Sequence, residues 1–248
     1  MMVLPFSYFG NAILDAPYGA KTTPHDGWFI GSFFPRDDPR YDPRVSLRFS
    51  LLPRGAGRED MTRELDTSVM WYVIFSGVLE NVFQFSGRDE ERVVLYQPMD
   101  CALIQPGHCH RWMVREECLV FMVRWETSEP KDQLIWTGNV DTIARDGVSS
   151  LMVGKSVFPS RHPSCTDAIQ INAEKFRKGA EFSLAANEGQ SRKVVLLVSG
   201  GVEVILSATE GRCIYVLSRE ADYHLLSDVG TARTVKVLED ACFITVAW

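Results

Sequence analysis

Two histidines in the stretch QPGHCHRWMV (105–114) are the most prominent candidates for chemistry in this chain. A proline and a glycine predict a turn, and His108 and His110 then follow at a spacing that puts both side chains on one face of a strand. An imidazole can ligate a metal ion or transfer a proton near neutral pH. His108 could instead belong to the turn itself. Cys109 would face away from both histidines, which favours a buried structural role over a nucleophilic one.

No other familiar catalytic or nucleotide-binding pattern occurs, because GxSxG, HExxH and P-loop sequences are all absent. The net charge is −6 and the basic residues are scattered, which argues against a nucleic-acid partner. No apolar run approaches the roughly 18 residues of a membrane span, so no membrane partner is expected. The six cysteines show no CxxC spacing, which indicates reduced thiols and a cytoplasmic location.

The elements that must position these side chains are predicted to be strands. Short apolar segments with period two are separated by turn residues, and no long segment carries a helical stripe. The predicted strands are 45–52, 70–85, 91–98, 100–106, 118–125, 168–172, 193–206, 212–217, 232–238 and 241–248. Many short strands at regular spacing predict an all-β sandwich or barrel.

The chain also contains an internal repeat. The segment FSGVLENVFQF around Gly77 is similar to VSGGVEVILSA around Gly200, and VREECLVFMVRW, ending at Trp125, is similar to VLEDACFITVAW, ending at Trp248. The two glycines and the two tryptophans are both 123 positions apart. A shared offset over separate matches indicates two copies of one unit.

The stretch YQPMDCALIQPGHCH resembles the second conserved motif of the cupin superfamily, and WYVIFSG resembles the end of the first motif. The resemblance implies an all-β bicupin fold of two tandem cupin-type jelly-roll β-barrels. The predicted parts are an N-terminal arm (1–27), an N-terminal barrel with the active pocket (28–126), a connection (127–155) and a degenerate C-terminal barrel (156–248).

The resemblance also implies which positions would ligate a metal. Counted back from the first-motif glycine, Met70 holds the glutamate slot and Glu64 and Asp66 hold the two histidine slots, while His110 matches the second-motif histidine. One imidazole, two carboxylates and a thioether match a facial iron site poorly, so no cofactor is expected. A divalent metal would have to use His110, Glu64, Asp66 and His108.

The second copy is expected to be structural. Its corresponding slots hold Asn187, Gly189 and Lys193, the last histidine slot falls near Ala232, and His224 lies elsewhere. No metal site is therefore predicted there. Lys193, in the glutamate slot, could bind an anion, but it is expected to be a solvated residue at the start of a strand.

Alternation along MWYVIFS directs Met70 and Tyr72 into the first barrel and Trp71, Val73 and Phe75 outward. The outward residues are large and apolar, which is typical of a strand buried on both faces. The sheets of the two repeats, or those of two subunits in a homodimer, are therefore predicted to pack back to back.

These observations favour an enzyme of small-molecule metabolism, of isomerase, cyclase or lyase type. His110 would act with Glu64 or Asp66 as acid and base without a metal. The residues expected to bind the small-molecule ligand are His108, Tyr72, Trp112, Arg111 and Met70. Two alternatives stay open: a non-catalytic small-molecule-binding or structural protein, and a metal-dependent oxygenase with atypical ligands.

Overall fold

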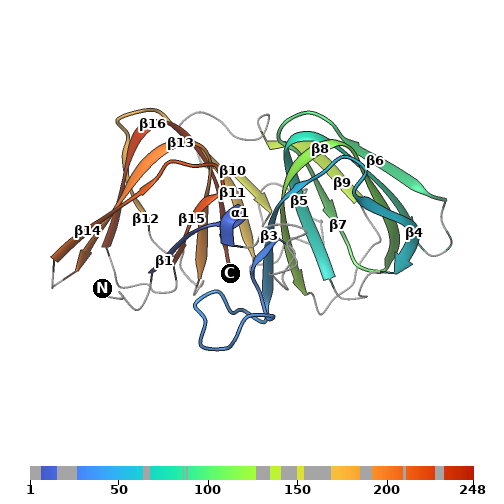
Figure 1. The fold of residues 1–248 in the computed structure, drawn as a ribbon, viewed down its shortest axis with the longest axis horizontal. Coiled ribbons are helices and arrows are strands. Elements are labelled where there is room, and N and C mark those ends of the chain that lie inside the picture. Colours follow the sequence, from blue (N-terminus) through green and yellow to red (C-terminus); the bar gives the residue numbers. More distant parts are fainter. Residues whose placement is uncertain are drawn as a thin grey trace. The chain divides into compact units, whose positions relative to one another are not determined.

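The computed structural model describes residues 7–15, 27–63, 68–85, 87, 89–126, 135–140, 150–153, 169–184, 192–208, 211–226 and 232–248. Nearly all of them lie in strands, and the described helix is the single turn α1 (Ala12–Asp15). The strands form two eight-stranded sheets (Figure 1). The chain divides into an N-terminal unit, Ala12–Asp141, and a C-terminal unit, Met1–Asn11 with Thr142–Trp248.

The N-terminal unit contains the first sheet, in the order β2-β3-β8-β5-β7-β9, with β4 paired to β8 and β6 to β5. Its strands are β2 (Trp28–Ile30), β3 (Val45–Leu52), β4 (Gly57–Arg63), β5 (Ser68–Phe85), β6 (Glu91–Leu95), β7 (Asp100–Ile104), β8 (His108–Glu126) and β9 (Ile135–Asn139). The two long strands β5 and β8 pair along most of their length and hold this unit together. The predicted cupin motifs lie on β5, β7 and β8.

The C-terminal unit contains the second sheet, in the order β1-β15-β13-β16-β11-β10, with β12 paired to β16 and β14 to β13. Its strands are β1 (Ser7–Asn11), β10 (Ser150–Val153), β11 (Gln170–Phe176), β12 (Glu181–Leu184), β13 (Lys193–Ala208), β14 (Gly211–Leu217), β15 (Asp222–Leu226) and β16 (Ala232–Ala247). The blue strand β1 therefore lies beside β15 among strands from the far end of the sequence (Figure 1).

The two units repeat one strand pairing in detail. The β5–β8 ladder shifts register between Ile74 and Leu79, and the β13–β16 ladder shifts at the corresponding positions. Gly77 and Gly200 lie within these shifts with φ values of 82° and 89°. A Cβ atom at either glycine would overlap the backbone of the facing strand, at Glu117 or Asp240. Only glycine accepts both the positive φ and the close approach of the facing backbone, which explains why glycine recurs 123 positions later in the second unit.

The edge strands β1 and β9 have equivalent roles in the two units. Asn139 at the end of β9 donates its Nδ2 to Asp100 Oδ1 at 2.9 Å, and Asn11 at the end of β1 donates its Nδ2 to Asp222 Oδ1 at 2.8 Å. In each unit the other carboxylate oxygen accepts two backbone N–H groups of the preceding turn. The arm expected before residue 28 and the connection expected after residue 126 thus each contain a strand that extends a sheet.

Strand β5 is buried on both faces, as its composition predicts. Trp71 and Val73 on one face and Tyr72 and Ile74 on the other are all buried. The face of Tyr72 belongs to the interior cluster of the unit, and the ring of Trp71 meets the ring of Phe121 edge-on at 6.3 Å. The predicted packing of this outer face against a second sheet or subunit stays a prediction.

Candidate functional site

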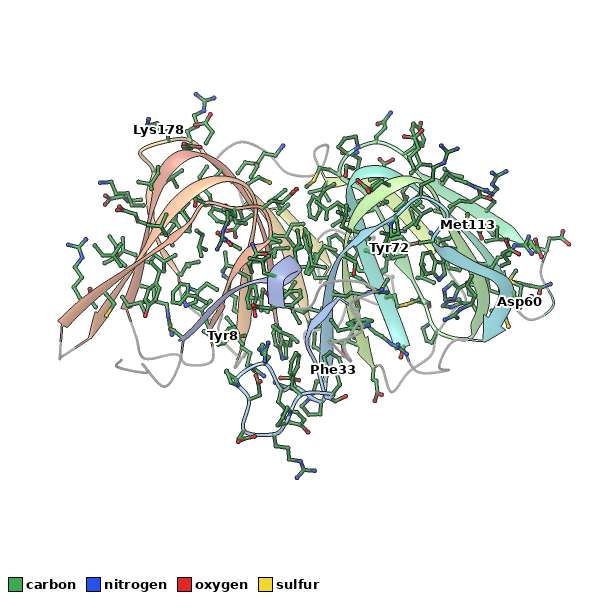
Figure 2. The ribbon with its side chains drawn as sticks, viewed as in Figure 1. Tyr8, Phe33, Asp60, Tyr72, Met113 and Lys178 are labelled. Atoms are coloured by element: carbon green, nitrogen blue, oxygen red, sulfur yellow. The ribbon has the colours of Figure 1, made fainter. Side chains whose placement is uncertain are left out.

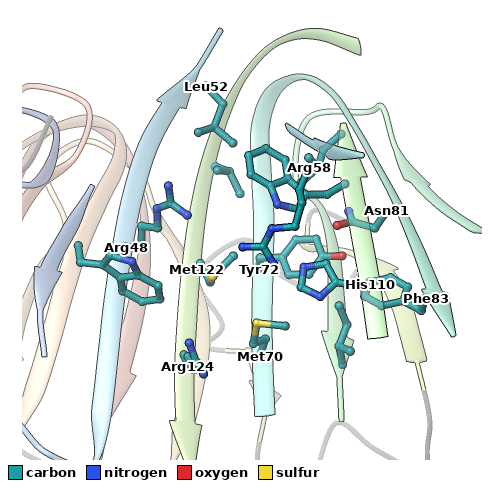
Figure 3. A pocket seen from close by; sticks show the side chains of 15 residues that line it. Arg48, Leu52, Arg58, Met70, Tyr72, Asn81, Phe83, His110, Met122 and Arg124 are labelled. Atoms are coloured by element: carbon teal, nitrogen blue, oxygen red, sulfur yellow. The ribbon is translucent and has the colours of Figure 1, made fainter. Parts of the chain in front are cut away.

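The interior of the N-terminal unit holds a cavity of about 310 Å³ (Figure 3). This volume suits a small organic molecule. Strands β3, β4, β5, β7 and β8 supply most of its wall, because the interior-facing side chains of neighbouring strands converge there. The residues that line it are Trp28, Arg48, Leu52, Arg58, Met70, Tyr72, Leu79, Asn81, Phe83, Ile104, His110, Trp112, Val120, Met122 and Arg124.

The cavity brings together four of the residues singled out from the sequence, namely Met70, Tyr72, His110 and Trp112. Met70 and Tyr72 alternate inward along β5, and His110 and Trp112 do the same along β8. Figure 3 shows His110 and Tyr72 pointing into the same space, with Met70 below them. The full side-chain view likewise shows Tyr72 inside the unit, with Asp60 of β4 at its outer edge (Figure 2).

His108 lies behind the cavity wall rather than in it. Its ring is fully buried, and Nδ1 donates to the carbonyl oxygen of Gln105 at 2.7 Å, which places the Nδ1 proton on this side. The ring lies 5.4 Å, centroid to centroid, from His110 and packs against Phe83 and Phe85. The two imidazoles thus share a strand face, but only His110 reaches the ligand space.

Arg111 points away from the cavity. It forms an ion pair with Glu90 at 3.0 Å, and both side chains are exposed. A residue between two inward-facing neighbours on a strand must face outward, so its expected place at the pocket does not follow from adjacency to His110. Glu64 and Asp66, the expected carboxylates, lie outside the described residues.

Three arginines give the cavity its charge, and sequence reasoning missed all of them. Arg48 of β3, Arg58 of β4 and Arg124 of β8 line the wall, and none of the described lining residues is acidic. The Arg48 guanidinium also lies over the ring of Trp28, 5.7 Å from its centroid, and its Nε donates to Ser50 at 3.1 Å. For Arg48 and Arg124 the available signal was a charged residue inside a predicted apolar strand, whereas Arg58 lies outside the predicted strands.

Two uncharged polar groups also face the cavity. The hydroxyl of Tyr72 and the amide nitrogen of Asn81 are buried, and neither has a hydrogen-bond partner among the described residues. Burial, followed by the charge of Cys101, raises the pKa of Tyr72 well above its ordinary value. Tyr72 is therefore a neutral hydrogen-bond donor at any working pH. Buried donors of this kind mark places where a ligand or water completes the bonding.

The described lining does not fit a metal cation. It contains one imidazole, the thioether of Met70 and three guanidinium groups, whose charge repels a divalent ion. In the described parts of the chain no group of three or more His, Cys, Asp or Glu side chains is placed to hold a metal. The predicted absence of a metal cofactor stays a prediction, since Glu64 and Asp66 are not among these residues.

The C-terminal unit carries different side chains at the corresponding positions. Lys193 matches Met70, as expected, but it is only 7% exposed, so its predicted solvation is wrong. Burial lowers its pKa, and the charge of Glu174 acts in the opposite direction. The strand register shows that Arg233, the residue after Ala232, has the position in the C-terminal unit that His110 has in the N-terminal unit.

Comparison with solved structures identifies the fold. The chain is similar to a cupin 2 conserved barrel domain protein from Leptotrichia buccalis, with 12% sequence identity and a TM-score of 0.56 over 83% of this chain and 84% of that one. It is also similar to a point variant of oxalate decarboxylase from Bacillus subtilis, with 10% identity and a TM-score of 0.57 over 82% of this chain and 68% of that one.

No protein-family model and no curated protein matches the sequence. The structural likeness nevertheless confirms the predicted fold class, which is all-β with two tandem jelly-roll units of the cupin type. At these identities it speaks for the fold alone. Among the described residues, no helix is long and apolar enough to cross a membrane.

Proposed function

We propose that the N-terminal unit binds a small carboxylate-bearing metabolite and moves a proton on it, as an isomerase, cyclase or lyase does. The observation that carries the proposal is the cavity lining: three arginines, a histidine and a tyrosine hydroxyl, with no acidic side chain among the described residues. Such a lining attracts an anion, because guanidinium groups match carboxylate geometry and are weakly hydrated.

The arginines lie at different parts of the cavity wall, so they can bind different groups of one ligand. Arg58 points toward His110 and Tyr72, whereas Arg48 and Arg124 extend from the other side (Figure 3). A carboxylate held by Arg58 would lie beside the imidazole. A second polar group on the same ligand would meet Arg48 and Arg124. The apolar remainder, including Leu79 and Val120 of the lining, suits a short carbon skeleton.

His110 is the group that transfers the proton in this scheme. It reaches the cavity from β8 and is the one histidine among the described lining residues, histidine being the side-chain type that transfers protons most readily near neutral pH. Arg58 would stabilise the negative charge that develops when a proton leaves carbon, and the neutral Tyr72 hydroxyl would donate a hydrogen bond to the same oxygen. Glu64 and Asp66 stay the candidates for the partner acid or base.

The test begins with ligand binding. Titration calorimetry with short mono- and dicarboxylates, and with their amides as uncharged controls, should detect binding of acids only. Arg58→Met and Arg124→Met should each weaken binding about tenfold or more, as expected for a lost charge-assisted hydrogen bond. Arg111→Met is the matched control, because Arg111 belongs to the same unit but lies outside the cavity. Equal binding by all three variants would refute the proposal.

Non-catalytic binding is the second candidate, favoured by the presence of only one proton-transferring side chain in the described lining. Exchange of substrate hydrogen with solvent distinguishes catalysis from binding alone. In D₂O, an enzyme that removes a proton from carbon should introduce deuterium into the bound acid, and His110→Gln should abolish this while keeping the fold. Tight binding without any deuterium uptake or turnover would favour a carrier or sensor.

A further inference from the structure

A second pocket of about 290 Å³ lies next to the cavity of the N-terminal unit. We call it the outer pocket; the residues that define it here are Trp28, Phe33, Arg44, Ser68, Arg124 and Trp125. Two of these residues, Trp28 and Arg124, also line the cavity. Phe33 belongs to the loop between β2 and β3, and Figure 2 shows it below Tyr72. The outer pocket is therefore a neighbour of the cavity within the same unit.

The interior face of three neighbouring strands runs from the cavity into the outer pocket. Cross-strand neighbours on β3, β8 and β5 form rows of side chains, and successive rows on one face are two residues apart along each strand. The successive rows are Arg48, Met122 and Tyr72, then Ser46, Arg124 and Met70, then Glu126 and Ser68. The first row lines the cavity, the second row is divided between the two spaces, and the third row lines the outer pocket. The two spaces are thus consecutive parts of one interior face.

The outer pocket presents aromatic surface. The Phe33 side chain is 37% exposed, and its ring centroid lies 6.2 Å from that of Trp28 and 5.0 Å from that of Phe34. A side chain at Gly31 would overlap the Phe33 ring, so glycine there lets the ring lie against the backbone. Trp125 is buried, and its indole N–H has no hydrogen-bond partner among the described residues. An aromatic ring that its neighbours hold in place offers an apolar surface to a ligand.

The charges around the outer pocket differ from those around the cavity. Arg44 forms an ion pair with Asp42 at 3.4 Å, and Asp42 also accepts the backbone N–H of Arg44 at 2.8 Å. Glu126 adds a carboxylate to the lining, whereas the described lining of the cavity has none. The outer pocket is therefore less selective for anions and suits an uncharged group. A planar guanidinium such as that of Arg44 packs well on the face of an aromatic ring.

We propose that the outer pocket binds the far end of the ligand, and that the substrate is a carboxylic acid that carries an aromatic ring at this end. The inference rests on the proposed function, because the carboxylate site fixes where the ligand begins. The rows of Tyr72 and Ser68 are four residues apart along β5, which is roughly 13 Å of extended strand. A carboxylate joined to a ring through a short chain spans this distance. The chain would pass Arg124, and the ring would pack on Phe33, which makes Phe33 a specificity-determining residue.

The test is titration calorimetry on the full chain with two series of acids. Straight-chain alkanoates of increasing length are compared with the same acids carrying a terminal phenyl group. The phenyl group should raise the affinity at least tenfold at the chain length that reaches the outer pocket, and less at shorter lengths.

Variants of Phe33 connect this gain to the outer pocket. Phe33→Ala should remove the gain without weakening the binding of acetate, which is too short to reach the outer pocket. Phe33→Tyr keeps the ring and should keep the gain. Tyr96→Ala is the matched control, because Tyr96 is an exposed aromatic residue of the same unit that lines neither space.

The outcomes separate this inference from the proposed function. If acetate binds but the phenyl group adds nothing at any length, or if Phe33→Ala leaves the gain intact, the outer pocket is not a subsite. If no acid of either series binds, the carboxylate site is wrong and the inference falls with it. Arg58 lines the cavity alone of the two spaces, so Arg58→Met should weaken both series by the same factor. A loss confined to the phenyl acids would contradict the assigned positions of carboxylate and ring.

Discussion

Replacing Tyr72 by phenylalanine should stabilise the ligand-free protein while weakening its function. The hydroxyl of Tyr72 is buried and has no hydrogen-bond partner among the described residues. An unsatisfied buried hydroxyl costs about 1–3 kcal/mol of desolvation, whereas the phenyl ring keeps the same packing. Tyr72→Phe should therefore raise the free energy of unfolding by about 1 kcal/mol. The same change removes a donor to the bound carboxylate and should weaken binding by about tenfold.

The two effects have opposite signs, which makes the experiment decisive. Urea unfolding of the ligand-free protein, followed by fluorescence, should show a higher midpoint for Tyr72→Phe at unchanged slope. Tyr96→Phe is the control, because Tyr96 is 62% exposed and its hydroxyl is already solvated. If Tyr72→Phe lowers the midpoint, the hydroxyl has a partner in the folded protein, and the assignment of Tyr72 as a donor to the ligand is wrong.

Three further predictions concern stability and reactivity. Gly77→Ala should lower the free energy of unfolding by more than about 3 kcal/mol, because the new Cβ overlaps the facing backbone. Gly107→Ala, at a similar φ but with open space around it, should lower it by about 1 kcal/mol in the same urea assay. Cys101 and Cys118, whose pKa values burial raises to about 12, should resist iodoacetamide at pH 8 until the chain unfolds, as mass spectrometry would reveal. Burial lowers the pKa of His224 to about 3, below its unfolded value of about 6.5. The neutral ring therefore contributes fully to the free energy of unfolding above pH 6.5, and this contribution falls by about 1.4 kcal/mol per pH unit as the pH is lowered toward 3. His224→Leu should flatten this pH dependence in unfolding curves measured at several pH values.

Much of the fold could be predicted because it depends on local patterns. The period of two predicts strands, and the spacing of Gly77 and Gly200 predicts a duplicated unit, since both glycines answer the same steric demand. The pairing of β1 with β15 could not be predicted in the same way. The two strands are more than two hundred residues apart in sequence, and a five-residue strand carries too little pattern to specify its partner.

Part of the site could also be predicted from a local pattern, the alternation of side chains along a strand. Alternation directs Met70, Tyr72 and His110 to one face, and the structure brings them into one cavity. Alternation does not say which face is hollow, so the pattern alone does not identify Arg48 and Arg124 as residues that line the cavity. Only the curvature of the sheet, which depends on all its strands together, makes that face an interior.

The two units show how one backbone can hold two kinds of interior. Where the N-terminal unit has Arg58 at the cavity wall, the C-terminal unit has Phe182, which stacks on Phe176 at 4.1 Å. The exchange turns a charged wall into apolar filling, yet the positions of Met70 and His110 become cationic rather than apolar. The same strand pairing therefore supports a hollow, arginine-lined interior in one unit and an interior with packed aromatic rings in the other.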